Sequence, residues 1–404
     1  MMPDDDQHRP PELTHGALFL RFLGFGAMAF GGPVAQIAMI RRELVEQEGW
    51  LSGARFNRLL AVMQALPGPE AHELCVHLGM RAKGRWGGLL AGLGFMLPGF
   101  GLMLIAAWAY FRFDIDHGRA AAALFGAQAA VVALIIRATH HIGAHILIDR
   151  ALWVIGGLAA VATLLAVPFW IVLPAGAATY ALVRTGRRMA ALGLLAAAGG
   201  AGLVWILAHQ PAGGGPESDA STPMQAATWT ALLLAGLKAG LLTFGGAYTA
   251  IPFLRQDLVG RGWLDDGTFL DGVAVANILP APLIIFSTFA GYAAGGFAGA
   301  LVMTAGVFLP AFAFSMIFYD RLETIVSEPR VRAALDGVAA AVVGVIAATA
   351  AGLAVGLYKP VGVGVGPFVI VAVALTALYL VKSRYAPPVV ILLAALAGVI
   401  LFRA

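Results

Sequence analysis

The chain has 404 residues, of which 60% are hydrophobic and only 12% are charged, and its formal net charge is +4. Soluble domains carry roughly 25% charged residues, so this composition excludes an ordinary soluble protein and indicates a membrane protein. The single cysteine, Cys75, excludes an internal disulfide and a thiol-based metal site.

The first predicted unit is a transmembrane repeat over residues 16–208. It follows a polar, acidic tail, residues 1–15, in which no basic segment precedes an apolar core, so no cleaved signal peptide is expected. Charges and Pro or Gly breaks divide the repeat into seven predicted spans, near 16–40, 57–80, 87–111, 119–138, 151–166, 168–183 and 189–208.

A polar linker, residues 209–226, contains Glu217 and Asp219 but no Lys or Arg, and is predicted to lie outside the cytoplasm. The second repeat, residues 227–404, has six predicted spans, near 227–252, 268–292, 296–319, 333–357, 361–381 and 386–402. The predicted fold is an all-α polytopic membrane protein with about thirteen transmembrane helices.

The basic residues predict a cytoplasmic N-terminus in a bacterial-type cytoplasmic (inner) membrane. With that orientation the loops 81–85, 137–150 and 184–188 are basic and cytoplasmic, as the positive-inside rule requires. The same bias explains the net charge without any nucleic-acid binding. One loop fits poorly, because residues 41–58 would lie outside and yet contain four arginines.

Short motifs of the first repeat recur about 213 residues later. Phe30-Gly31-Gly32-Pro33 returns as Phe244-Gly245-Gly246-Ala247, and the segment 64–69 returns as 277–282. The offset drifts only from 214 to 211 along the chain, which indicates one duplicated unit. Seven spans is an odd number, so the second copy is predicted to be inverted. Inverted repeats with broken helices are typical of secondary transporters.

The Phe-Gly-Gly motif is predicted to interrupt the first span of each repeat. Paired Gly costs about 1 kcal/mol per residue in a helix interior, and a proline there removes a backbone donor. One interpretation is an unwound helix whose N–H groups line a substrate cavity, at Gly31, Gly32, Pro33, Gly245 and Gly246. The alternative is a close-packed glycine contact between helices.

Two prolines separated by one residue are predicted to break the next apolar segment of each repeat. The candidate substrate-binding residues are Gln64, Pro67, Gly68 and Pro69 in the first repeat and Asn277, Pro280 and Pro282 in the second. A helix that starts at such a proline presents free N–H groups and the positive end of its dipole to an anion. The alternative is a pair of structural kinks. The segments could cross the membrane or re-enter it, and the basic loop 81–85 favours crossing.

Ionisable residues inside the spans are further candidates, because charge is costly in hydrocarbon. Lys238 lies six residues before Phe244, where a cation suits an anionic substrate; the alternative is snorkelling to an interface. Glu70 and Glu73 follow the first Pro-Gly-Pro and could carry a coupled proton, or belong to a self-satisfied polar cluster. These side chains match no recognised metal-ligand spacing.

Arg41 and Arg255 end the first predicted span of each repeat. In an inverted arrangement they face opposite sides, so the positive-inside rule cannot explain both. Together they could form an anion-attracting mouth on each side. The alternative is that each arginine anchors a helix end.

These motifs resemble the chromate ion transporter family in its long, two-domain form. The resemblance comprises Phe-Gly-Gly-Pro, Arg41, the segment 49–51 and Gln-x-x-Pro-Gly-Pro-Glu, and it covers roughly residues 15–404. It implies a membrane carrier that exports chromate and confers resistance to it, with sulfate as an isosteric competitor. Ala247 and Ala281 depart from the pattern, so the second repeat is expected to be less open to backbone contact.

The sequence therefore predicts a secondary transporter, not an enzyme, that moves chromate outward by alternating access and is driven by the membrane potential, by proton exchange or by both. It contains no phosphate-loop motif and implies no cofactor. Rival interpretations are a carrier for sulfate or another anion, an uncoupled anion channel, and an intramembrane chromate reductase. The predicted partners are a chromate- or sulfate-like oxyanion and membrane lipid. The sequence leaves open the physiological substrate, the coupling ion and the oligomeric state, a homodimer included.

Overall fold

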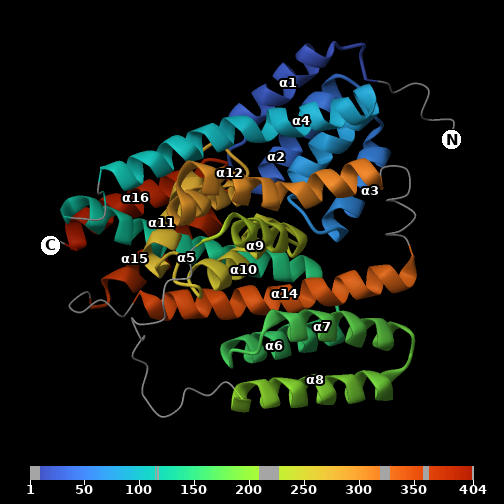
Figure 1. The fold of residues 1–404 in the computed structure, drawn as a ribbon, viewed down its shortest axis with the longest axis vertical. Coiled ribbons are helices and arrows are strands. Elements are labelled where there is room, and N and C mark those ends of the chain that lie inside the picture. The colour runs from blue at the N-terminus through green and yellow to red at the C-terminus, as the bar shows by residue number, and fades with distance from the viewer. Residues whose placement is uncertain are drawn as a thin grey trace.

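The computed structural model describes residues 10–113, 115, 118–208, 227–318, 328–357 and 364–402, and every regular element in these ranges is a helix (Figure 1). The first repeat contains α1 His15–Ala27, α2 Gly32–Ile40, the π-helix Arg41–Gln47, α3 Gly53–Ala65, α4 Glu70–Arg112, α5 Gly118–Ile146, α6 Arg150–Leu164, α7 Phe169–Arg184 and α8 Arg188–Ala208. The second contains α9 Trp229–Leu241, a 3₁₀ turn Ala247–Thr249, α10 Ala250–Leu258, α11 Asp266–Ile278, a 3₁₀ turn Leu283–Ile285, α12 Phe286–Ile317, α14 Pro329–Gly356, α15 Gly366–Leu380 and α16 Ala386–Leu401.

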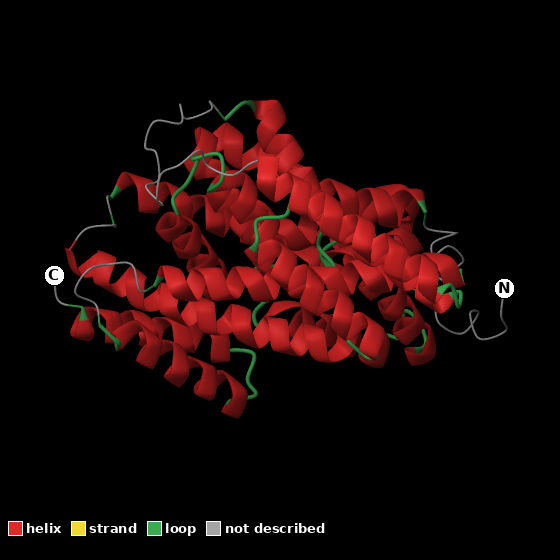
Figure 2. Cartoon of the chain, turned by 90° about the horizontal axis from the view of Figure 1, so that it is seen from below, coloured by secondary structure: helices red, strands yellow, loops and turns green. Residues whose placement is uncertain are grey.

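The described chain is all-α, as predicted, and Figure 2 shows the helices packed side by side with short loops between them. The predicted linker 209–226 and most of the predicted tail 1–15 lie outside the described residues.

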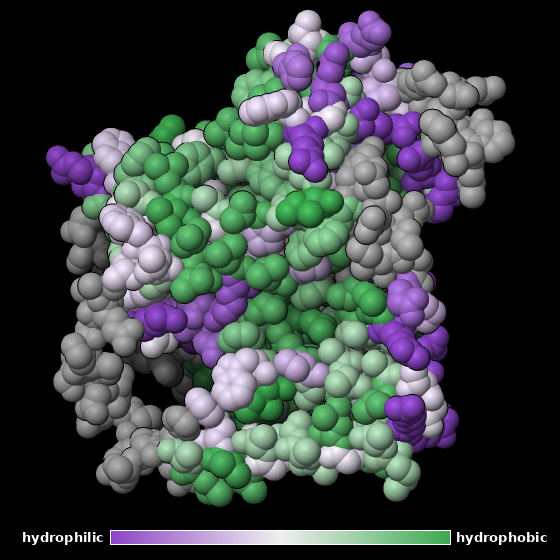
Figure 3. Space-filling model, turned by 45° about the vertical axis from the view of Figure 1, so that its right-hand side comes forward, coloured by the Kyte–Doolittle hydropathy of each residue, from purple (hydrophilic) through white to green (hydrophobic). Residues whose placement is uncertain are grey.

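The helices have the length and surface of a multi-pass membrane protein. Among the described residues, five helices are long and apolar enough to cross a membrane: Glu70–Arg112, Gly118–Ile146, Arg188–Ala208, Leu283–Ile317 and Pro329–Gly356. Large side chains such as Leu203 and Leu393 are exposed on the outside of the bundle. Figure 3 shows a broad hydrophobic face; hydrophilic residues gather near its top and right-hand edges, and a smaller hydrophilic patch lies left of its centre. So large an apolar surface marks contact with lipid.

The two repeats begin their helices with capping residues at matching positions. Thr14 caps α1 and Thr228 caps α9, each by accepting a hydrogen bond from the backbone N–H three residues on, at 3.1 and 3.3 Å. Ser52 caps α3 and Asp265 caps α11 in the same way. A side-chain oxygen at this position satisfies an N–H that has no partner inside the helix. The duplicated unit therefore folds with the same local boundaries in both copies.

The duplication extends to backbone geometry inside the long helices α4 and α12. Lys83 (φ −142°, ψ 29°) and Gly84 (φ 61°, ψ −155°) interrupt α4. Gly295 (φ −154°, ψ 24°) and Gly296 (φ 62°, ψ −153°) interrupt α12. The positive φ at the second position favours glycine. Each long helix is thus two helices joined by the same sharp turn.

The first apolar segment of each repeat turns back on itself at the Phe-Gly-Gly motif. Arg21 on α1 forms an ion pair with Glu48, which follows the π-helix. Lys238 Nζ on α9 lies 2.5 Å from Asp257 Oδ2 on α10. Straight helices would hold the members of these pairs about 40 and 28 Å apart at 1.5 Å per residue. Each segment is therefore a helical hairpin; we call its turn break 1 (residues 28–31) or break 2 (residues 242–246).

The Pro-x-Pro segments double back as well. Arg81 donates a hydrogen bond of 3.4 Å to the backbone carbonyl of Trp50, although α3 and the first part of α4 lie between them in sequence. In the second repeat, a Cβ added at Gly272 on α11 would lie 2.5 Å from Phe289 Cδ1 on α12. The prolines therefore form the turn of a second hairpin in each repeat. We call these turns tip 1 (residues 66–69) and tip 2 (residues 279–282).

These hairpins correct the predicted span count. The prediction of a single crossing is wrong for 16–40, 57–80, 227–252 and 268–292, because the chain returns to its starting side within or just after each segment. The prediction that glycines and prolines break the helices there is confirmed.

The two repeats are joined by reciprocal packing of their long helices. α5 packs against α15 and α16 of the second repeat, and its counterpart α14 packs against α6 and α7 of the first. Glycine allows the helices to approach closely at both of these helix–helix contacts. A Cβ added at Gly126 would lie 2.1 Å from the Ala394 carbonyl oxygen, and one at Gly337 would lie 2.4 Å from the Gly176 carbonyl oxygen. Each repeat thus supplies part of the other's core.

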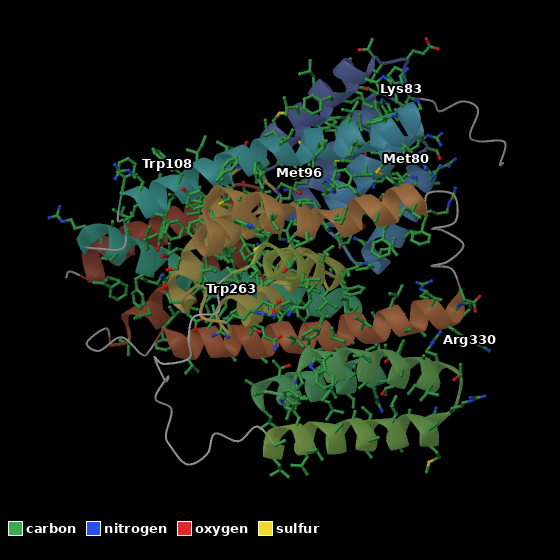
Figure 4. All side chains as sticks on the ribbon, viewed as in Figure 1. Met80, Lys83, Met96, Trp108, Trp263 and Arg330 are labelled. Carbon is green, nitrogen blue, oxygen red and sulfur yellow. The ribbon has the colours of Figure 1, made fainter. Side chains whose placement is uncertain are left out.

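Matching helices of the two repeats run in opposite directions. In Figure 1, α4 runs from blue at the right to cyan at the left, whereas α12 runs from gold at the left to orange at the right. Figure 4 gives the same direction for α4, with Lys83 near the right-hand end, Met96 in the middle and Trp108 at the left.

Substituting Gly176 by alanine is expected to lower the free energy of unfolding by about 1–3 kcal/mol, the usual cost of overpacking a core. A Cβ at this position would lie 2.9 Å from the Gly337 carbonyl oxygen and 3.0 Å from Ala341 Cβ. Gly157→Ala is the matched control, because no atom lies within 4 Å of a Cβ there and both helices gain the same alanine propensity. Thermal unfolding of the purified proteins in detergent compares the two variants. Equal midpoint temperatures would contradict the close packing of α7 against α14.

Candidate functional site

The four helix interruptions meet in two pairs, and each pair joins one repeat to the other. The backbone N–H of Gly68 in tip 1 donates a 2.8 Å hydrogen bond to the carbonyl of Thr243 in break 2. The buried Gln36 amide, on α2, donates to the carbonyls of Ala29 in break 1 (2.9 Å) and Ala281 in tip 2 (3.3 Å). Each tip is therefore fastened to the break of the opposite repeat.

Both breaks are unwound backbone. Gly31 and Gly32 have φ of 88° and 77°, and Gly245 and Gly246 have φ of 68° and 130°. Pro33 lies in the first turn of α2, where it starts a helix and does not kink one. The backbone is therefore unwound at both breaks, as one of the two alternatives predicted, whereas a substrate cavity lined by these glycines stays a prediction.

Break 1 also contains a close contact that the sequence did not indicate. A Cβ added at Gly31 would lie 2.8 Å from Arg384 Cβ and 2.8 Å from its carbonyl oxygen, whereas nothing lies within 4 Å of one at Gly32. The next residue, Tyr385, packs its ring 5.8 Å from that of Phe30. The turn between α15 and α16 thus lies against break 1.

Tip 1 is buried and brings a carboxylate against the backbone. Pro67, Gly68 and Pro69 are buried, and Gly68 has φ of 150°. A Cβ added at Gly68 would lie 2.2 Å from Glu73 Oε1. At tip 2 Ala281 has no positive φ, which explains why alanine can replace glycine there. Pro280 is half-buried and Pro282 is buried.

Glu70 and Glu73 lie in the first turn of α4, directly after tip 1. Glu73 is 0% exposed, and neither carboxylate oxygen has a hydrogen-bond partner among the described residues. Glu70 is also buried, and it is hydrogen-bonded to the exposed Gln64 side chain. Burying a carboxylate without a partner is costly unless it is protonated. Of the two predicted candidates, Glu73 is therefore the more isolated.

The remaining predicted groups have partners within their own repeat. Asn277 accepts a hydrogen bond of 2.8 Å from the Tyr248 hydroxyl. Arg255 forms two hydrogen bonds of 2.7 Å to the Asp266 carboxylate, and Arg41 Nε lies 3.1 Å from Glu46 Oε1. These acidic partners offset the positive charge of each predicted mouth.

Lys238 lies apart from the tips. Its ammonium group pairs with Asp257 and lies 4.6 Å from the centre of the Phe169 ring. It belongs to a cleft of about 580 Å³ between the α9–α10 hairpin and the helices α7 and α8. The lining residues are Pro168, Phe169, Trp170, Trp205, Leu234, Ala235, Lys238, Gln256, Asp257, Gly260 and Arg261. No tip residue is among them, so the structure does not bring Lys238 together with the Pro-x-Pro motifs.

Gln36 is the residue of the central contacts that sequence reasoning missed. It is a buried polar side chain in an apolar helix, three residues after Pro33. The rule that singled out Lys238, a polar group deep in a span, would have found it if amides had been included. Sequence reasoning also missed Asp257, because it lies beyond the predicted span 227–252 and only the turn at break 2 brings it beside Lys238.

Comparison with known proteins follows the same division into two halves. The chromate transporter family model matches residues 16–182 and 230–399. A chromate transport protein of Pseudomonas aeruginosa is 56% identical over 396 residues, which cover 97% of this chain and 94% of that protein. A chromate transport protein of Cupriavidus metallidurans is 31% identical over 412 residues, covering 98% of this chain and 95% of that protein. No solved structure matches the chain.

Proposed function

This chain belongs to the chromate transporter family, and from that premise we propose that it exports chromate across the bacterial cytoplasmic membrane and so confers chromate resistance. The mechanism is alternating access of two inverted repeats, with the N-terminus in the cytoplasm. The membrane potential favours this direction, because each negative charge that leaves the cell gains about 2.3 kcal/mol per 100 mV.

The hairpins are compatible with inverted repeats. Two of the seven spans predicted for the first repeat are hairpins, which leaves five crossings and still an odd number. The opposite directions of α4 and α12 support the same arrangement (Figure 1). Hairpins that return to their starting side also put the loop 41–58 on the N-terminal side. Its four arginines then obey the positive-inside rule, which they violated in the predicted topology.

The observation that carries the proposal is the reciprocal fastening of tip 1 to break 2 and of tip 2 to break 1. In an inverted pair, these two contacts lie between hairpins that enter from opposite sides. Releasing one contact while the other holds would open the centre to one side only, which is what alternating access requires. Non-helical backbone at membrane depth is tolerated where it is buried or lines a cavity.

The proposed substrate contacts are the unwound backbone and side chains at these interruptions. They are Gly31, Gly32, Pro33, Gln64, Pro67, Gly68 and Pro69 from the first repeat, and Gly245, Gly246, Asn277, Pro280 and Pro282 from the second. Gln36 positions tip 2 and joins this set. Glu73 is the proposed proton carrier, with Glu70 one turn of helix away.

The test is chromate uptake into everted membrane vesicles, with the membrane potential and the pH gradient collapsed separately. Saturable accumulation that falls when the potential is collapsed is the expected result, since the interior of such vesicles is positive. Vesicles without the protein are the control. Accumulation no greater than in the control would contradict chromate export.

Sulfate discriminates between the rival carriers in the same assay. A sulfate transporter would accumulate sulfate with chromate as the weaker competitor, whereas a chromate exporter shows the reverse preference. A channel would give flux that does not saturate and does not respond to the pH gradient.

A further inference from the structure

The cleft that holds Lys238 lies outside the contacts between tips and breaks, and its charges have no role in the mechanism proposed above. Its volume of about 580 Å³ far exceeds that of one water molecule, about 30 Å³ in the liquid. A small tetrahedral ion with part of its hydration shell therefore fits.

Two cations in this cleft converge on a single carboxylate. Lys238 Nζ lies 2.5 Å from Asp257 Oδ2, and Arg261 Nη2 lies 3.8 Å from Asp257 Oδ1. The Lys238 and Asp257 side chains are 21% and 11% exposed, and that of Arg261 is 44% exposed. The group therefore has a net charge of +1, and each carboxylate oxygen faces one cation. Two oxygens on the edge of a tetrahedral oxyanion can take these places.

The charged residues of the cleft do not recur at the matching positions of the first repeat. Gly24 stands at the position that matches Lys238, and Glu48 stands near the position that matches Arg261. Glu48 is itself paired with Arg21. Each repeat therefore has an ion pair across its break, but the second carboxylate oxygen has a different neighbour in the two copies. In the first repeat Glu48 Oε2 accepts a 2.9 Å hydrogen bond from the neutral Trp50 indole N–H, whereas in the second repeat Asp257 Oδ1 faces the Arg261 cation. The surplus positive charge that an anion needs is thus a feature of the second repeat.

We infer that this cleft is a second oxyanion site, in which a tetrahedral dianion displaces the Asp257 carboxylate and bridges Lys238 and Arg261. The chemistry is that of sulfate, chromate or a phosphate monoester, so the ligand is either a free dianion or the phosphomonoester of a lipid headgroup. The Lys238–Asp257 pair fastens α9 to α10 across break 2. Binding in the cleft therefore loosens the hairpin that holds tip 1.

The experiment is sulfate titration of the purified full-length protein in phosphatidylcholine nanodiscs, followed by tryptophan fluorescence. Trp170 and Trp205 line the cleft and report on it, and the double substitution Trp170→Phe/Trp205→Phe identifies their signal. Asp257→Asn removes the competing carboxylate and is expected to lower the sulfate Kd about five- to tenfold. Lys238→Met is expected to abolish the response.

The sign of the Asp257→Asn effect is decisive. If Asp257 only anchored Lys238, its loss would leave sulfate affinity unchanged or weaken it, and either result would overturn the inference. Arg261→Gln keeps the Lys238–Asp257 pair and covers the case in which Asp257→Asn fails to fold. It is expected to raise the sulfate Kd several-fold, and an unchanged Kd would count against the site.

Two further sets of nanodiscs, one with phosphatidic acid and one with the same fraction of phosphatidylglycerol, identify the source of the ligand. A phosphomonoester headgroup in the cleft would raise the apparent sulfate Kd more with phosphatidic acid than with phosphatidylglycerol, whereas a site for free anions would respond about equally to the negative surface charge that both lipids supply. The titration uses no ion gradient, so its outcome is independent of whether the protein exports chromate. Gly24→Ala, outside the cleft and with nothing within 4 Å of a Cβ, is expected to leave the titration unchanged.

Discussion

Gly68→Ala is expected to reduce the rate of chromate uptake more than about tenfold. Gly68 has φ of 150°, which L side chains rarely adopt, and strain of this kind costs on the order of 1–3 kcal/mol. A tenfold change in rate corresponds to about 1.4 kcal/mol. The new Cβ would also lie 2.2 Å from Glu73 Oε1, so the carboxylate must leave its place. The backbone strain and the displaced carboxylate both act at the point where the Gly68 N–H donates its hydrogen bond to break 2.

The measurement is the initial rate of uptake into everted vesicles, normalised to the amount of protein in the membrane. Gly24→Ala is the matched control, because it has no positive φ and nothing lies within 4 Å of its Cβ. A Gly68→Ala protein that transports at the wild-type rate would show that tip 1 is only a structural kink.

Glu73→Gln is expected to abolish the part of transport that depends on the pH gradient and to keep the part that depends on the membrane potential. Glutamine has nearly the shape of a protonated glutamic acid but cannot release a proton. Glu73 is fully buried, with no hydrogen-bond partner for its carboxylate among the described residues. Such a group changes protonation when its surroundings change from buried to hydrated.

Collapsing the pH gradient and the potential separately, in vesicles of each variant, distinguishes the two components. Glu43→Gln is the control, since Glu43 is 28% exposed and pairs with Arg42 in the π-helix that follows α2. An unchanged response to the pH gradient in Glu73→Gln would exclude Glu73 as the proton carrier. If Glu70→Gln then abolished the response, the proton would be carried by the first residue of α4.

The sequence predicted the duplication and located the four interruptions at the Phe-Gly-Gly and Pro-x-Pro motifs, because glycine pairs and closely spaced prolines leave a local mark. It did not predict that the segments around them double back. A hairpin of two helices of about thirteen residues and a single broken span can have the same apolar length and composition. What separates them is pairing between the two ends, as in Arg21 with Glu48. Spacing along one helix carries no signal for such a pair.

Only part of the candidate site could be predicted, again because local backbone preferences can be read from the sequence and contacts between distant residues cannot. Glycines and prolines were identified because their backbone preferences are intrinsic. The position of Lys238 depends on Asp257 and Phe169, which are distant in sequence and come from two repeats. Conversely, the arginines of the loop 41–58 already disagreed with the predicted topology, and that disagreement was a usable sign of a hairpin.

The exchange of helices between the repeats constrains how the protein is made. α5 is complete once residue 146 has been synthesised, but its partners α15 and α16 begin only at residues 366 and 386, which are 220 and 240 residues later. At about 5–20 residues per second, the ribosome needs roughly 10–50 s to cover these distances. During this interval the Gly126 face of α5 lacks the helix it will pack against. The first repeat must therefore stay in the membrane with the packing surface of α5 uncovered until the last helix of the second repeat has been synthesised and inserted.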